Sequence, residues 1–96
     1  MKRSPIPNSL RKHRKIRGLT QSDVSRVLGL ASTGLISRWE RGVCLPKPQT
    51  IFKLAALYRT MAEALYVDLF RSIRQEVMET EERLKPAGHR ASITTT

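Results

Sequence analysis

The sequence predicts an all-α protein, and three observations support this fold class. Apolar residues recur at intervals of three and four, as on one face of a helix, and no β-type alternation occurs before residue 91. Glycines and prolines stand between the apolar segments, where they end one helix or begin the next. The 96 residues, 40% of them hydrophobic, suit one small domain with an appendage. We therefore expect no second domain and no deep cleft between lobes.

The start of the chain predicts an extended arm followed by a basic helix. Pro5 and Pro7 favour an extended conformation over residues 1–7. A helix is expected from Asn8, a residue of the capping type, and Gly18 stops it. This helix also carries a run of basic side chains (Arg11, Lys12, Lys15 and Arg17). Such a run most often forms a solvated face.

The next two expected helices are joined by a tight turn. Thr20 is placed as the N-cap of the first, and Asp23 falls in its first turn, where a negative charge suits the helix dipole. The apolar face of this helix is expected to contain Val24, Val27 and Leu28. Gly29 can adopt the left-handed conformation that ends the helix. The second helix begins at residue 32 or 33, runs to residue 41 and stops at Gly42.

Two further helices complete an expected set of five. Pro48 suits the first position of one of them, whose inward stripe is expected to be Ile51, Leu54, Ala55 and Tyr58. The last helix is expected to run without a break from about Met61 to residue 85. It places apolar residues at steps of four (Leu65, Leu69, Ile73 and Val77). Residues 86–96 are polar and are expected to be frayed.

The formal net charge of +10 is concentrated in one part of the chain. Residues 1–60 hold 13 basic and 2 acidic side chains, whereas residues 61–96 hold 5 basic and 6 acidic ones. A chain that needed charge only for solubility would have little reason to segregate it. The first part is therefore predicted to meet a polyanion.

Other classes of protein find little support in the sequence. Cys44 is the single cysteine, so an internal disulfide is impossible, and no apolar run approaches the roughly 18 residues of a membrane span. The basic start is not followed by the apolar segment of a signal peptide, and we expect a cytoplasmic protein without membrane association. His13 and His89 are too isolated for a metal site. We expect neither an enzyme nor a cofactor.

The middle of the chain carries a set of spaced motifs. They are Gly18-Leu19-Thr20-Gln21, Leu28-Gly29, Ile36-Ser37-Arg38-Trp39-Glu40-Arg41-Gly42 and Pro48-Gln49-Thr50-Ile51. In these residues the sequence resembles the Cro/repressor-type helix-turn-helix family, often called the XRE family. The resemblance implies a five-helix lambda-repressor-like domain over residues 8–70, after a basic arm at 1–7. A helical extension at 71–85 and a flexible tail at 86–96 would follow.

The resemblance also assigns roles to single residues in DNA recognition. It matches Thr33, Gly34, Ser37 and Arg38 to positions that face bases, and Gln21 and Arg41 to positions that contact the DNA backbone. Lys47 lies in the loop that follows the backbone in this family, while Lys2 and Arg3 are candidates for an arm contact. Arg38 is the sharpest candidate, because a guanidinium can bind guanine O6 and N7 together. The segment between Gly29 and Ile36 is one residue longer than in the tightest phage-repressor pattern.

Arg14 and Glu40 match a partly buried ion pair of the family that joins the first helix to the third. The alternative for Arg14 is a phosphate contact from a basic helix, and the alternative for Gln21 is a merely exposed polar residue. We favour the ion pair, because breaking it would leave the negative charge of Glu40 uncompensated close to DNA. Ile36 and Trp39 are expected to face the core and fix the reading helix.

The acidic part of the chain suggests a second role. Apolar residues continue along the last helix beyond the domain, and a dimer contact is expected through Tyr66, Leu69, Phe70, Ile73 and Val77. The alternative is a solvated helix with no partner. A heptad frame at positions 66, 73 and 80 makes a poor coiled coil, so a short packed helix pair is preferred.

Together these patterns predict a sequence-specific regulator of transcription that binds double-stranded DNA as a homodimer on a palindromic operator. Repression is the default expectation, and activation through contact with RNA polymerase stays open. The rival hypothesis is a protein-binding regulator on the same fold, such as an antitoxin-like or anti-activator module. A general RNA binder is a third option that the few aromatic residues do not favour.

Overall fold

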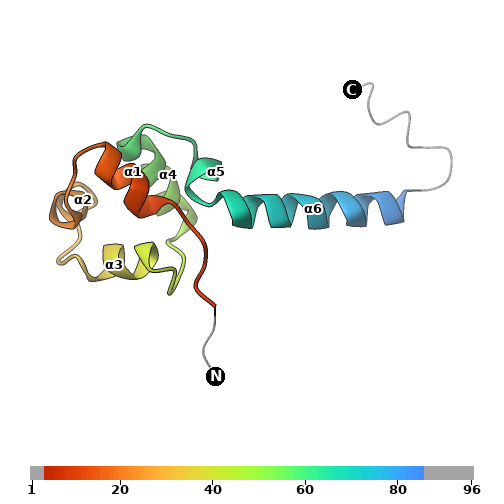
Figure 1. Cartoon of the computed structure of the whole chain (residues 1–96), viewed down its shortest axis with the longest axis horizontal. Coiled ribbons are helices and arrows are strands. Elements are labelled where there is room, and N and C mark those ends of the chain that lie inside the picture. The colour runs from red at the N-terminus through yellow and green to blue at the C-terminus, as the bar shows by residue number, and fades with distance from the viewer. Residues whose placement is uncertain (1–3, 86–96) are drawn as a thin grey trace.

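The computed structural model describes residues 4–85, which form six helices and no strand (Figure 1). The helices are α1 (Leu10–Ile16), α2 (Gln21–Val27), α3 (Gly34–Glu40), α4 (Pro48–Tyr58), α5 (Ala62–Leu65) and α6 (Val67–Leu84). Helices α1 to α5 pack into one body, and α6 projects from it next to α5 (Figure 1). The predicted all-α class is confirmed. Within residues 4–85, no helix is long and apolar enough to cross a membrane.

A single hydrophobic core holds the short helices together. It consists of nine buried residues: Leu10, Val24, Ile36, Trp39, Leu54, Ala55, Tyr58, Leu65 and Tyr66. Helices α1, α2 and α3 have seven residues each, a length that is not stable in isolation, so burial in this core stabilises them. The expected inward position of Val27 is wrong, because this side chain is 63% exposed. Val24 and Ser25 are the buried residues of α2, and Leu28, which follows the helix, packs partly against the core.

The ends of α2 form as the sequence predicts. Thr20 Oγ1 accepts a hydrogen bond from the backbone N–H of Asp23 (3.0 Å), and Asp23 Oδ2 accepts one from the N–H of Thr20 (2.9 Å). This reciprocal capping box satisfies backbone donors that the first turn leaves free. The same bonds hold the pKa of the Asp23 carboxyl below its usual range. Gly29 follows the helix with a φ of +72°, in the left-handed region.

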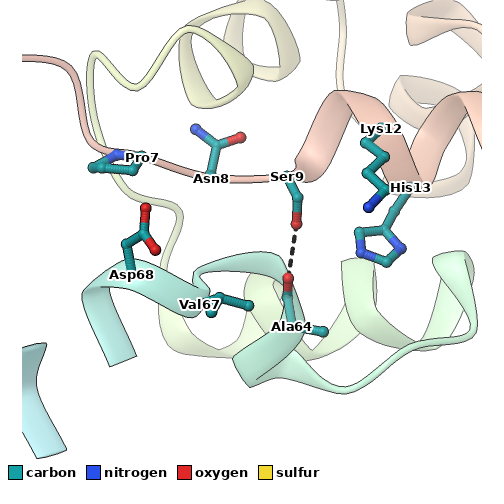
Figure 2. Close-up of a pocket in the computed structure, with 8 residues that line it drawn as sticks. All are labelled: Pro7, Asn8, Ser9, Lys12, His13, Ala64, Val67 and Asp68. Carbon is teal, nitrogen blue, oxygen red and sulfur yellow. Dashed lines mark hydrogen bonds between the residues drawn. The ribbon is translucent and has the colours of Figure 1, made fainter. Parts of the chain in front are cut away.

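The start of α1 is joined to α5 by two hydrogen bonds. Ser9 Oγ donates to the carbonyl oxygen of Ala64 (2.7 Å; Figure 2), and the backbone N–H of Ser9 donates to the carbonyl of Leu65 (2.9 Å). At the other end of α1, Arg17 Nε donates to the carbonyl of Leu57, at the end of α4 (3.1 Å). Both ends of α1 are therefore fixed to later parts of the chain.

The expected continuous helix over residues 61–85 is divided at Tyr66. This residue has φ −135° and ψ 54°, outside the helical region, and separates α5 from α6. Leu65 and Tyr66 are consecutive and both are buried in the core, which turns the backbone before α6 leaves the domain. The sequence pattern misses this break because the apolar steps of four continue through it.

Residues 5–8 lie against the domain rather than forming a free arm. The backbone N–H of Ile6 donates to the carbonyl of Gly42 (2.9 Å), and the Ile6 side chain packs against the core. Asn8 Nδ2 donates to the carbonyls of Ile6, Trp39 and Glu40 at 3.0, 3.2 and 3.3 Å. The last two carbonyls belong to the final turn of α3, where the Trp39 carbonyl also accepts from the backbone N–H of Gly42 (3.0 Å). The N-terminal segment therefore caps the end of α3.

Candidate nucleic-acid interface

An ion pair fixes α3 against α1. Arg14 Nε lies 2.6 Å from Glu40 Oε2, and the two side chains are only 10% and 6% exposed. A second Arg14 nitrogen donates to Glu40 Oε1 (3.2 Å), and a third donates to the backbone carbonyl of Leu19 (2.9 Å). The hydrogen bond with Glu40 raises the pKa of Arg14 above its usual value. The ion pair that the resemblance implies is therefore present in the domain.

Gln21 takes part in the same network. Its side-chain Nε2 donates to Glu40 Oε1 (3.1 Å), which joins the first residue of α2 to the last residue of α3. An amide nitrogen carries two hydrogens, so the second remains for an acceptor outside the domain. The carboxylate of Glu40 thus holds α1 and α2 in place around α3.

The outward face of α3 presents Ser37, Arg38 and Arg41. Arg38 and Arg41 are exposed, and Arg41 Nε donates to Ser37 Oγ one turn earlier (3.2 Å). This bond orients the Arg41 side chain along α3 toward the start of the helix. Among the described contacts, Arg38 makes no ion pair with an acidic side chain. Its guanidinium lies over the first turn, with one nitrogen 3.9 Å from the position that a Cβ would take at Gly34.

Thr33 and Gly34 begin the same helix. Thr33 occupies the N-cap position, but its side chain makes no capping bond, and both residues are half-buried. A Cβ at Gly34 would meet only Ser32 Oγ at 3.6 Å and the Arg38 nitrogen, which are ordinary contact distances. The fold therefore does not require glycine at position 34.

A polar hollow of about 210 Å³ lies where α1, α2 and α3 meet. It is lined by Arg11, Arg14, Gln21, Ser37, Glu40 and Arg41. The structure therefore brings together Gln21, Ser37 and Arg41, which the sequence places on two separate helices, and adds Arg11 from α1. Arg11 was only one member of a basic run in the sequence. Its position one turn before Arg14, which faces α3, is the signal that could have identified it.

The charges around this face are unbalanced. Asp23 and Glu40 are the two acidic residues of residues 4–60, and each already has a basic partner: Arg26 at 2.7 Å and Arg14 at 2.6 Å. The same stretch contains eleven basic residues. Arg11, Arg38 and Arg41 therefore present positive charge that no neighbouring carboxylate in the described chain neutralises.

The remaining candidates for backbone contact lie at the edge of this region or outside the described chain. Lys47 is exposed at the N-cap of α4, in the extended conformation that precedes Pro48. Lys2 and Arg3 lie outside residues 4–85. The described segment that ends at Asn8 lies at the C-terminal end of α3 (Figure 1). Lys2 and Arg3 come just before this segment in the sequence.

The five residues expected to form a dimer contact fall into two groups. Tyr66 is buried in the core of the domain, so its assignment to a subunit interface is wrong. Leu69 is partly buried against the same core. Phe70, Ile73 and Val77 are exposed on α6 and remain available for a partner.

A second hollow of the described chain is lined by no residue of α3. It has a volume of about 480 Å³ and lies between the N-terminal segment with α1 and the α5–α6 junction (Figure 2). Its polar side chains include Lys12 and His13 on one side and Asp68 on the other. No group of three His, Cys, Asp or Glu residues suited to a metal ion occurs within residues 4–85.

Comparison with protein-family models identifies residues 8–66 as a match to the model described as a helix-turn-helix domain. The match covers more than half of the chain and includes every helix from α1 to α5. Comparison with curated proteins and with solved structures gave no significant match.

Proposed function

The chain belongs to the helix-turn-helix domain family, and from this premise we propose that it is a sequence-specific regulator of transcription that binds double-stranded DNA. In this role α3 enters the major groove, and α2 lies across the DNA backbone. The observation that carries the proposal is the basic outer face of α3, where Arg38 and Arg41 are exposed beside a network that fixes the helix.

The reading residues follow from this arrangement. Arg38 takes a guanine through O6 and N7, while Thr33, Ser37 and the backbone at Gly34 lie close to neighbouring bases. Gln21, Arg41 and Lys47 bind phosphates and set the register, and Arg11 adds a further positive charge at the hollow. The buried pair of Arg14 and Glu40 contacts no DNA and positions α3.

The regulator acts as a homodimer on a palindromic operator, with half-sites about 34 Å or 10 base pairs apart. Binding there blocks RNA polymerase, which makes repression its default effect. A dimer that neutralises about 6–10 phosphates loses about 10³–10⁵-fold in affinity between 50 and 200 mM salt.

Arg38→Ala tests the reading role. We expect a loss of about 1–3 kcal/mol on the preferred sequence and a relaxed preference at one base position, because one bidentate contact is removed. Gln21→Ala should instead weaken all sequences alike. Arg71→Ala is the matched control, since it removes the same charge from α6, outside the domain. Equal losses for Arg38→Ala on specific and random DNA, in titrations by fluorescence anisotropy, would refute the assignment.

If neither specific nor random DNA bound, these titrations would support the alternative function, a protein-binding regulator on the same fold. In that case the basic face of α3 would have an acidic protein as its partner. An affinity for DNA that falls steeply with salt would instead support DNA binding, because it reports the release of counterions from the phosphate backbone.

A further inference from the structure

Helix α6 carries an apolar stripe that no part of the described chain covers. Phe70, Ile73, Val77 and Leu84 are 46%, 48%, 58% and 77% exposed, and no residue of α6 is buried. With Thr80 these residues are spaced three, four, three and four apart. This is the a and d pattern of a helix that pairs with another helix. The frame differs from the one through Tyr66, which the core of the domain occupies.

Charged residues border the stripe on both sides. In this frame Arg74 and Glu81 take the e positions, and Glu76 and Arg83 take the g positions. Arg74 has no acidic residue three or four positions away along α6, so its helix offers it no ion-pair partner. The charges are also ordered along α6: Arg71 and Arg74 lie in the first half, and four glutamates lie in the second half.

The geometry points to a second copy of this chain as the partner of α6, bound antiparallel through the stripe, with Arg74 of each copy opposite Glu81 of the other. In the same register Glu76 of each copy lies opposite Arg83 of the other. The basic first half of one helix then faces the acidic second half of its partner, which explains the order of charges. The inference specifies the homodimer of the proposed function and rests on it in that respect.

The charges exclude the other simple arrangements. In a parallel pair each g residue faces the following e residue of the partner, so Glu76 would lie beside Glu81 twice. In the antiparallel register one heptad away, Arg74 would face Arg74 and Glu76 would face Glu76 across the two-fold axis. Only the proposed register places four pairs of opposite charges along the contact between the two helices.

The apolar layers of this register are short. Ile73 packs against Leu84 of the other copy, and Val77 packs against Thr80, so the contact spans residues 73–84, or about 18 Å of helix. The surface buried by so short a contact is smaller than the surface that a stable protein–protein interface normally buries. We therefore expect a weak dimer that forms at high protein concentration and is completed on the operator.

The test is sedimentation of the full chain without DNA, at protein concentrations up to about 500 µM. Arg74→Glu replaces two attractive pairs by two repulsive ones, and we expect the dimer dissociation constant to rise about tenfold or more. Arg71→Glu is the matched control: it makes the same charge change at a b position of the same frame, outside the a, d, e and g positions of the contact, and should leave the dimer nearly unchanged. Circular dichroism verifies that each variant keeps its helix content.

Glu81→Arg separates the two orientations by the sign of its effect. In the antiparallel pair it places a second positive charge opposite Arg74 and weakens the dimer, whereas in a parallel pair it would relieve the repulsion from Glu76 and strengthen it. Combining Arg74→Glu with Glu81→Arg in one chain restores the antiparallel dimer. A stronger dimer with Glu81→Arg, no effect of Arg74→Glu, or a wild-type monomer at every concentration would each overturn the inference.

Binding to a DNA duplex with one half-site is measured in parallel. If pairing fails, the monomer should still bind this half-site, so the proposed function stands. If the chain dimerises but shows no preference between the half-site and scrambled DNA, the proposed function fails and the pairing stands.

Discussion

The domain of α1 to α5 and the projecting α6 use the same kind of helical pattern in opposite ways. In the domain, helices of four to eleven residues each bury at least one apolar residue in one shared core. Helix α6 has 18 residues and an apolar stripe of its own, yet none of its residues is buried. An apolar stripe therefore predicts a helix, but it does not tell whether its partner lies in the same chain or in another.

The two regions also differ in how they handle charge. The two acidic residues of residues 4–60 are bound to basic partners, which leaves the domain strongly positive. Helix α6 has five acidic and three basic residues, arranged in blocks. A polyanion suits the first region and a complementary helix suits the second, so substitutions in the two regions should have different consequences.

The largest effect on stability is expected from Glu40→Ala. It leaves the guanidinium of Arg14 buried without its carboxylate, and removes the acceptor of Gln21, for a loss of about 3–5 kcal/mol in the free energy of unfolding. Urea denaturation measures this loss. Glu76→Ala on α6, where the side chain is exposed, should change the same quantity by less than about 0.5 kcal/mol. Similar losses of unfolding free energy for both variants would show that the buried carboxylate of the domain contributes no more to stability than the exposed one on α6.

Gly42→Ala should have the next largest effect. The φ of Gly42 is +76°, and an added Cβ would lie 2.5 and 2.6 Å from the backbone oxygen and nitrogen of Ile6. Gly29→Ala is the control, since its φ is +72° but nothing lies within 4 Å of the new atom. We expect about 1–2 kcal/mol for Gly29→Ala from the backbone conformation alone.

For Gly42→Ala the clash adds to this loss, because the N-terminal segment must move away from the end of α3. Thermal unfolding of the two variants measures the difference. Equal losses would mean that the docked segment contributes nothing to the stability of the domain.

Alkaline pH should destabilise the core and leave α6 unaffected. Burial raises the pKa of Tyr58 and of Tyr66 to about 12, from the ordinary value of 10.0. A raised pKa means that the folded state favours the neutral phenol. The stability that the two buried phenols contribute is therefore fully present below pH 10. It is lost as the pH rises toward 12.

Denaturation at several pH values between 9 and 12 tests this window. Replacing both tyrosines by phenylalanine controls for lysines, which titrate in the same range. Tyr66→Phe alone should not destabilise the protein at pH 7, because the Tyr66 hydroxyl is buried without a hydrogen-bond partner in the described chain. A destabilised Tyr66→Phe variant would reveal a partner for this hydroxyl.

The smallest effect on the monomer is expected from Ile73→Ala. This side chain is 48% exposed on α6, and its truncation at low protein concentration should change the unfolding free energy by less than about 0.5 kcal/mol. Leu54→Ala is the comparison in the core, with an expected loss of about 2–5 kcal/mol. A large loss for Ile73→Ala in the monomer would place α6 inside the cooperative unit of the domain.

Much of the fold follows from local signals in the sequence. The capping residue Thr20, the left-handed Gly29 and Pro48 at the start of α4 lie where their chemistry predicts, and each acts within a few residues. The ion pair of Arg14 and Glu40 joins residues 26 positions apart and followed from the resemblance to a family rather than from spacing.

The features that the sequence did not reveal depend on distant contacts. The break at Tyr66 arises because the core buries two consecutive residues, although the apolar spacing continues through them. The bonds from Asn8 to the end of α3 span 31 and 32 residues, and no local pattern marks them. Arg11 became a candidate for DNA contact only when α1, α2 and α3 enclosed a common hollow.

The most direct test of the account is selection of binding sites from random duplex DNA with the full chain, followed by salt titration of the selected sequence against a scrambled one. We expect enrichment of a sequence with two related half-sites about one helical turn apart, and a fall in affinity of about 10³–10⁵-fold between 50 and 200 mM salt. Failure to enrich any sequence, with equal affinity for selected and scrambled DNA, would contradict the proposal that α3 reads bases.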